Sequence, residues 1–111
     1  MESISLDSLA AENLTAAQQA HSGRSAHTIY GGGHKALRQT LVALRAGEAL
    51  AEHDSPGEAT LQVLRGRVRL TAGDDAWEGT AGDLVVIPPT RHALESLEDS
   101  AVVLTVAKHM P

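Results

Sequence analysis

The side chains in this sequence that can do chemistry are imidazoles and carboxylates. The 111 residues include six histidines and 14 Asp and Glu residues, but no cysteine. A chain without cysteine has no disulfide, no thiolate nucleophile and no Cys-ligated zinc or iron–sulfur centre. Any metal held by side chains must therefore rest on His, Asp or Glu. No serine lies in a nucleophile-elbow pattern, so the sequence assigns no catalytic residue.

Length and charge exclude several classes of partner. The chain is long enough for one compact domain and too short for two ordinary ones. Nine Lys and Arg residues, scattered along the chain, leave a formal net charge of −5, which argues against a nucleic-acid or anionic-membrane surface. No apolar stretch approaches the roughly 20 residues of a membrane span, and the start lacks the layout of a secretion signal. These features predict a cytoplasmic protein with no nucleic-acid or membrane partner.

An amphipathic helix is predicted over residues 5–20. The segment is rich in Ala, Leu, Gln and Glu, with apolar residues at spacings of three and four. Ser5 or Asp7 can cap its start, and Gly23 is placed to end it. A helix of this length is marginal alone, so we expect its stripe to dock on the rest of the chain or on a second subunit. The stripe consists of Leu6, Leu9, Ala10, Leu14, Ala17 and Ala20.

Residues 25–109 are predicted to form an all-β domain, preceded by the helix and linker of residues 1–24. A short β-prone stretch at 26–30 and three glycines are followed by about eight short strands separated by Gly, Pro or Asp, which favours a sandwich or barrel. Strict alternation over Arg67–Thr71 predicts that Val68 and Leu70 face inward and both arginines face water. The eight expected strands are Leu37–Arg45, Ala49–His53, Thr60–Arg65, Arg67–Ala72, Ala76–Glu78, Asp83–Pro88, His92–Leu97 and Ala101–Ala107.

The segment Gly47–Gly66 resembles the first motif of the cupins. That motif runs Gly, five residues, His-x-His, three or four residues, Glu, six residues, Gly. Gly47, His53 and Gly66 fall at matching positions.

A second segment, Gly82–His92, resembles the second cupin motif, which runs Gly, five residues, Pro-x-Gly, two residues, His. Gly82 and Pro88 match, Thr90 stands where Gly is usual, and His92 comes one residue early. The resemblance covers about residues 36–107. It implies a small, RmlC-like jelly-roll β-barrel, similar to one-domain cupins that form homodimers, with both motifs lining one pocket.

The resemblance also implies a metal site, because cupins hold a divalent metal with two His and a Glu of the first motif and a His of the second. Carried over by position, these ligands become His53, Ser55, Ala59 and His92. Ser is a poor ligand for a transition metal and Ala is none, so a Zn, Ni, Mn or Fe ion would keep two imidazoles and water. His34, which follows the three glycines, is a further candidate ligand.

The carboxylates near these positions are expected to point away from the pocket. By strand alternation, Glu52 and Asp54 lie outside on either side of His53, and Glu58 lies outside next to Ala59.

Three functional hypotheses follow. The first is a ligand-binding or sensory cupin whose pocket is formed by His53, Ser55, Ala59 and His92. Loss of a Glu and a His predicts a wider, less charged cavity suited to a small polar or anionic ligand, with Arg91 near its rim.

The second hypothesis is a divalent-metal-dependent cupin enzyme of dioxygenase or isomerase type, in which His34 or a carboxylate joins His53 and His92. The third is a homodimeric scaffold, in which the N-terminal helix swaps onto the partner because its aliphatic stripe should not face water.

Overall fold

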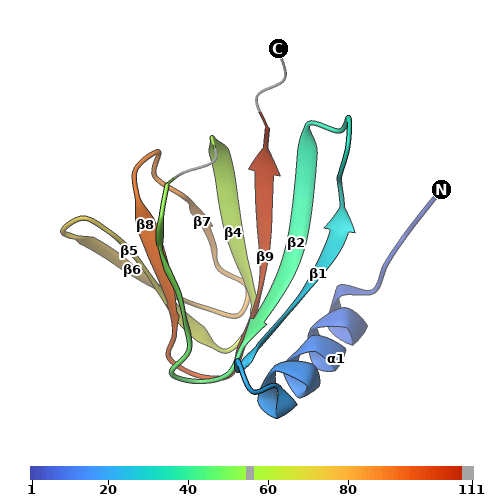
Figure 1. The fold of residues 1–111 in the computed structure, drawn as a ribbon, viewed down its shortest axis with the longest axis horizontal. Helices are drawn as coiled ribbons and strands as arrows, with labels where there is room; N and C mark the ends of the chain where they lie inside the picture. Colours follow the sequence, from blue (N-terminus) through green and yellow to red (C-terminus); the bar gives the residue numbers. More distant parts are fainter. Residues whose placement is uncertain (55–56, 109–111) are drawn as a thin grey trace.

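The computed structural model describes residues 1–54 and 57–108, so Ser55 and His109 lie outside the described residues. This part of the chain contains one helix and nine strands (Figure 1). No helix within it is long and apolar enough to cross a membrane.

Helix α1 spans Leu6–Gln19. Ser5 is its N-cap, and the Ser5 hydroxyl accepts a hydrogen bond from the Ser8 N–H at 3.2 Å, which satisfies one of the free N–H groups of the first turn. The expectation that Gly23 ends the helix is wrong, because the C-cap is Ala20. Gly23 instead takes a φ of +70° in the turn that follows, where a Cβ atom would lie 2.6 Å from the side chain of Glu48.

The apolar stripe of α1 is covered within the same chain. Leu9 and Ala10 pack against Leu41 and Ala101 on the outer face of a sheet, and all four are buried. The sequence left open whether this stripe docks on its own domain or on a second subunit. The structure shows docking on the chain's own sheet, so exposure of the stripe no longer argues for a helix swap.

The strands form two antiparallel sheets that face each other as a jelly-roll barrel (Figure 1), which confirms the all-β prediction. The five-stranded sheet has the order β1-β2-β9-β4-β7 and the four-stranded sheet the order β3-β8-β5-β6. In chain order the strands are β1 (Arg24–Tyr30), β2 (Leu37–Leu44), β3 (Ala49–His53), β4 (Glu58–Arg65), β5 (Arg67–Ala72), β6 (Asp75–Thr80), β7 (Leu84–Val86), β8 (His92–Ser96) and β9 (Ser100–Ala107).

The strand predictions differ from the structure mainly at their ends. β3 and β5 have the predicted bounds, and the stretch at 26–30 belongs to β1, an edge strand. β7 is shorter than the predicted Asp83–Pro88: it ends at Val86, shortly before Pro88 and Pro89, which have no N–H to donate.

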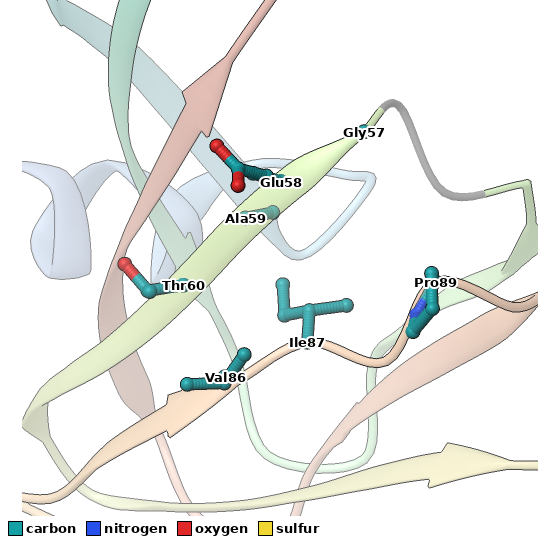
Figure 2. A pocket seen from close by; sticks show the side chains of 7 residues that line it. All are labelled: Gly57, Glu58, Ala59, Thr60, Val86, Ile87 and Pro89. Atoms are coloured by element: carbon teal, nitrogen blue, oxygen red, sulfur yellow. The ribbon is translucent and has the colours of Figure 1, made fainter.

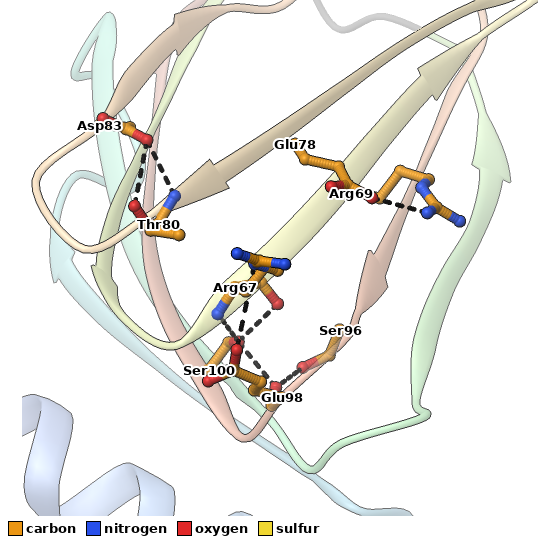
Figure 3. Close-up of polar contacts among 8 residues, drawn as sticks. All are labelled: Arg67, Arg69, Glu78, Thr80, Asp83, Ser96, Glu98 and Ser100. Atoms are coloured by element: carbon orange, nitrogen blue, oxygen red, sulfur yellow. Dashed lines mark hydrogen bonds and ion pairs between the residues drawn. The ribbon is translucent and has the colours of Figure 1, made fainter.

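Aliphatic side chains from both sheets fill the space between them, as a chain without Phe requires. Val68 is fully buried and Leu70 is 4% exposed, whereas Arg67 and Arg69 lie on the outer surface. This confirms the predicted alternation of β5. Arg69 donates to Glu78 at 2.6 Å on that surface (Figure 3).

The turn between β4 and β5 packs against the turn that leads into β9. Gly66 there has a φ of +79°, and a Cβ atom would lie 2.3 Å from the Asp99 carbonyl oxygen. Ser100 holds the same turn, because its hydroxyl accepts from the Arg67 N–H at 3.1 Å and donates to the Glu98 carbonyl at 2.7 Å (Figure 3). The glycine of the first motif is therefore required by close packing of two turns.

Candidate functional site

Strands β3 and β8 place His53 and His92 opposite each other. The pairing runs Ala49 with Glu95 and Leu50 with Leu94, and then His53 with His92. Between the last two pairs β3 advances by three residues and β8 by two, so β3 contains a β-bulge. In a regular strand, residues three apart point to opposite faces. The extra residue turns His53 to the interior side, where Leu50 also points.

The two imidazole rings are in direct contact. Their centroids are 4.4 Å apart, and the ring planes meet at 66° in an edge-to-face arrangement. His92 is only 4% exposed, whereas His53 is exposed to solvent. The pair therefore reaches from the barrel interior to its surface.

Both rings are oriented by their own backbone. His53 Nδ1 lies 2.9 Å from the Ala51 carbonyl oxygen, and His92 Nδ1 lies 2.9 Å from the Thr90 carbonyl oxygen. A carbonyl oxygen only accepts, so each Nδ1 must carry a proton that it donates. In a neutral ring the distal Nε2 then keeps its lone pair. No hydrogen bond within the described residues engages either Nε2.

A small aliphatic cavity lies against the two rings. Its volume is about 50 Å³, and apart from His53 and His92 its walls are apolar. The expected wide cavity is therefore wrong for this position, because leucines and other aliphatic side chains of both sheets fill the barrel. These residues are Val42, Leu50, Leu61, Leu70, Ile87, Leu94, Val102 and Leu104.

Ala59 faces inward but does not line the cavity at the histidines. It lines a separate hollow of about 780 Å³ between the start of β4 and the segment that follows β7. Figure 2 shows the side chains of Ala59 and Ile87 facing this space. Ile87 also lines the smaller cavity, so it lies between the two. Glu58 was predicted to face away from the pocket; it is exposed, but it lines the same hollow as Ala59 (Figure 2).

His34 is not brought to the histidine pair, because it is exposed in the turn between β1 and β2 and does not line the cavity. Ser55 lies outside the described residues. Over residues 1–54 and 57–108, no three His, Asp or Glu side chains gather in a way that could hold a metal ion.

Arg91, which was expected near the rim of the pocket, does not line the cavity at the histidines and is paired with two carboxylates on the outer surface. Its guanidinium donates to Glu52 at 2.9 Å and to Asp54 at 3.1 Å, and all three side chains are more than half exposed. The hydrogen bond to Glu52 and the charge of Asp54 raise the pKa of Arg91 above its usual value. Glu52 and Asp54 point outward, as predicted.

This donor set does not fit the metal of a typical cupin site. Within the described residues it supplies two imidazole nitrogens, and the position of the metal-binding Glu is Ala59. Zinc is held by three or four protein ligands, and non-haem iron by two His and a carboxylate.

A family model described as "Cupin domain" matches residues 40–108. The chain belongs to the cupin family. No curated protein matches it. The matched region contains both histidines of the site and every strand of the barrel except β1 and the start of β2.

Solved structures of other proteins share the cupin fold. A conserved protein of unknown function from Streptococcus pyogenes is 25% identical, with a TM-score of 0.73 over 83% of this chain and 80% of that chain. A cupin superfamily protein from Desulfitobacterium hafniense is 15% identical, with a TM-score of 0.67 over 77% and 79% of the two chains. KdgF from a Halomonas species is 19% identical, with a TM-score of 0.67 over 78% and 82%.

Two features of the cupin site were missed by the sequence analysis. One is the clamp that Arg91 makes with Glu52 and Asp54, for which the only signal was opposite charge next to each histidine. The other is the bulge in β3. Its signal was the spacing of Leu50 and His53, which are three apart yet both suited to the interior.

Proposed function

We propose that this cupin binds the polar end of a small molecule at His53 and His92, in the cavity that both side chains line. The observation that carries the proposal is that the two rings are held in the same way beside one cavity. Each Nδ1 lies 2.9 Å from a backbone carbonyl two residues earlier in the chain, no hydrogen bond within the described residues engages either Nε2, and both side chains line the same cavity.

The chemistry of the pair defines the kind of ligand. Neutral Nε2 atoms accept hydrogen bonds from hydroxyl, amide or ammonium groups, and after protonation they would donate to a carboxylate. Aliphatic walls exclude competing water and so strengthen such bonds. A cavity of about 50 Å³ has room for one polar group, so the rest of the ligand would lie outside, beside the exposed His53.

A metal-dependent cupin enzyme is the second candidate. One observation favours it: a histidine that donates from Nδ1 to a backbone carbonyl is oriented as metal-ligating histidines usually are. The small number of donors weighs against it, because two imidazoles alone leave most of a coordination sphere to water or substrate.

The two candidates can be separated with protein purified without an affinity tag. Ethylene glycol, acetamide and acetate serve as probes of hydroxyl, amide and acid groups in ligand-observed NMR. We expect at least one probe to bind the wild type, and its signal to disappear in His53→Ala. His27→Ala is the matched control, because His27 is exposed on β1, away from the cavity.

Three results would overturn the proposal. The first is that no probe binds the wild type, and the second is probe binding that is unchanged in His53→Ala. The third is stoichiometric Fe, Mn, Ni or Zn in the wild type that is absent from a His53→Ala/His92→Ala variant, which would establish the metal site instead. A melting curve for each variant shows that it is folded.

A further inference from the structure

The outer side of the β3–β8 pair contains a second arrangement, directly behind the two imidazoles. One guanidinium reaches three oxygen atoms at the end of β3: Arg91 Nε lies 2.9 Å from Glu52 Oε1, Nη1 lies 3.1 Å from Asp54 Oδ1, and Nη2 lies 3.4 Å from the Glu52 carbonyl oxygen. Glu52 and Asp54 flank His53 in the chain, and Arg91 precedes His92. We call these three residues the Arg91 clamp.

The clamp lies beside an interruption of the backbone pairing between β3 and β8. β3 is an edge strand, so only β8 supports it through main-chain hydrogen bonds. The β-bulge interrupts that ladder between Leu50 and His53. The end of β3, which carries His53, therefore has few backbone restraints of its own.

We infer that Arg91 is a positioning residue, whose clamp on Glu52 and Asp54 holds His53 against His92. Neighbouring residues of a strand point to opposite sides, so a restraint on Glu52 and Asp54 outside also fixes the backbone of His53 between them. The importance of this geometry for binding rests on the proposed function. The geometry itself does not depend on a ligand.

The surroundings of Arg91 do not support an anion-binding role. Two carboxylates oppose its single positive charge, and its side chain does not line the cavity at the histidines. The exposure of these side chains also argues against a large contribution of Arg91 to the stability of the whole domain. The Arg91 and Glu52 side chains are 56% and 59% exposed, and exposed ion pairs add little to the free energy of folding.

The test uses full-length protein without ligand and measures the nuclear Overhauser effect between the two imidazole rings. Arg91→Ala should abolish or strongly reduce this effect, and Arg91→Lys should restore part of it, since lysine can pair with one carboxylate but lacks the fork of donors. Arg69→Ala is the matched control. Arg69 also bridges two carboxylates, Glu78 at 2.6 Å and Glu95 at 3.5 Å, in the same sheet. Arg69→Ala should leave the Overhauser effect between the rings unchanged.

The salt dependence of the same Overhauser effect is a second test, because salt would not change it if Arg91 acted only by filling space. Because the clamp is exposed, 1 M salt, with a screening length of about 3 Å, should weaken the Overhauser effect between the rings in the wild type. It should have no further effect in Arg91→Ala. Melting temperatures of Arg91→Ala and Arg69→Ala should agree closely, because each substitution removes two exposed ion pairs.

The outcomes test the Arg91 clamp and the proposed function separately. An Overhauser effect that persists in Arg91→Ala, or that disappears equally in Arg69→Ala, overturns the inference. If the effect disappears only in Arg91→Ala and probe affinity falls roughly five-fold, both proposals are supported. If the effect disappears only in Arg91→Ala but the wild type binds no probe, the clamp is supported and the proposed function is overturned.

Discussion

Substitution of Leu94 by alanine should lower the free energy of unfolding far more than the same substitution of an exposed leucine, because the Leu94 side chain lines the cavity at the histidines. Leu94 is 3% exposed and packs in the main core between the two sheets. Buried Leu→Ala changes cost about 2–5 kcal/mol, and the cost rises when surrounding side chains cannot collapse into the space. The existing cavity of about 50 Å³ shows that these walls do not close by themselves. We therefore expect Leu94→Ala to lower the free energy of unfolding by about 3–4 kcal/mol.

Urea unfolding measures this cost, and Leu84→Ala provides the control. Leu84 lies on β7 with 59% of its surface exposed, so the same chemical change there should cost less than about 1 kcal/mol. The slope of the transition should be equal in the two variants, which shows that the folded and unfolded states remain comparable. A Leu94→Ala cost within about 1 kcal/mol of the Leu84→Ala cost would refute the reasoning, because it would mean that the core around the histidines is loosely packed.

Three further predictions concern the frame of the barrel. The Asp99 carboxylate accepts a hydrogen bond from the Ala46 N–H at 2.8 Å, and this bond above all lowers its pKa below the usual value. Its stabilising contribution is therefore present above its unfolded pKa and lost as pH falls through the folded pKa; we expect Asp99→Asn to be less stable than the wild type at pH 7 and to differ less from it at acidic pH. Gly66→Ala should cost more than about 2 kcal/mol in unfolding assays, because its Cβ would collide with a carbonyl, whereas Gly73→Ala, which has positive φ but open space, should cost about 1 kcal/mol. Deletion of residues 1–22 should lower the melting temperature, because it uncovers the sheet under α1; a dimer mass in solution that the deletion leaves unchanged would rule out the helix as the main contact between subunits.

The parts of the fold that depend on local pattern could be predicted from the sequence. Alternation of polar and apolar residues predicted the two faces of β5, and residue spacing predicted α1. Both signals act over a few residues, where the period of the backbone decides which side chains share a face. The motifs in turn placed His53 and His92 in one site, and the register of β3 with β8 shows them as partners.

The site was predicted less well than the fold, because cavity shape depends on packing between distant strands. Ala59 occupies a motif position next to the histidines, yet Ile87 lies between its hollow and theirs. The orientation of Arg91 depended on charges 37 and 39 residues away in the chain. No local sequence pattern predicts that Ile87 separates the two hollows, or that Arg91 pairs with residues so far away in the chain.

The sequence by itself determined the class of fold and the absence of cysteine chemistry, because composition and short-range spacing contain this information. Its resemblance to the two cupin motifs placed His53 and His92 in one site. Tertiary structure decided the rest. In the folded chain, the apolar stripe of α1 packs on a sheet of the same chain, a small aliphatic cavity replaces the expected wide pocket, and a β-bulge turns His53 inward. The physical reason is that side-chain volume is shared between strands far apart in the chain, so the space left for a ligand exists only after they have packed.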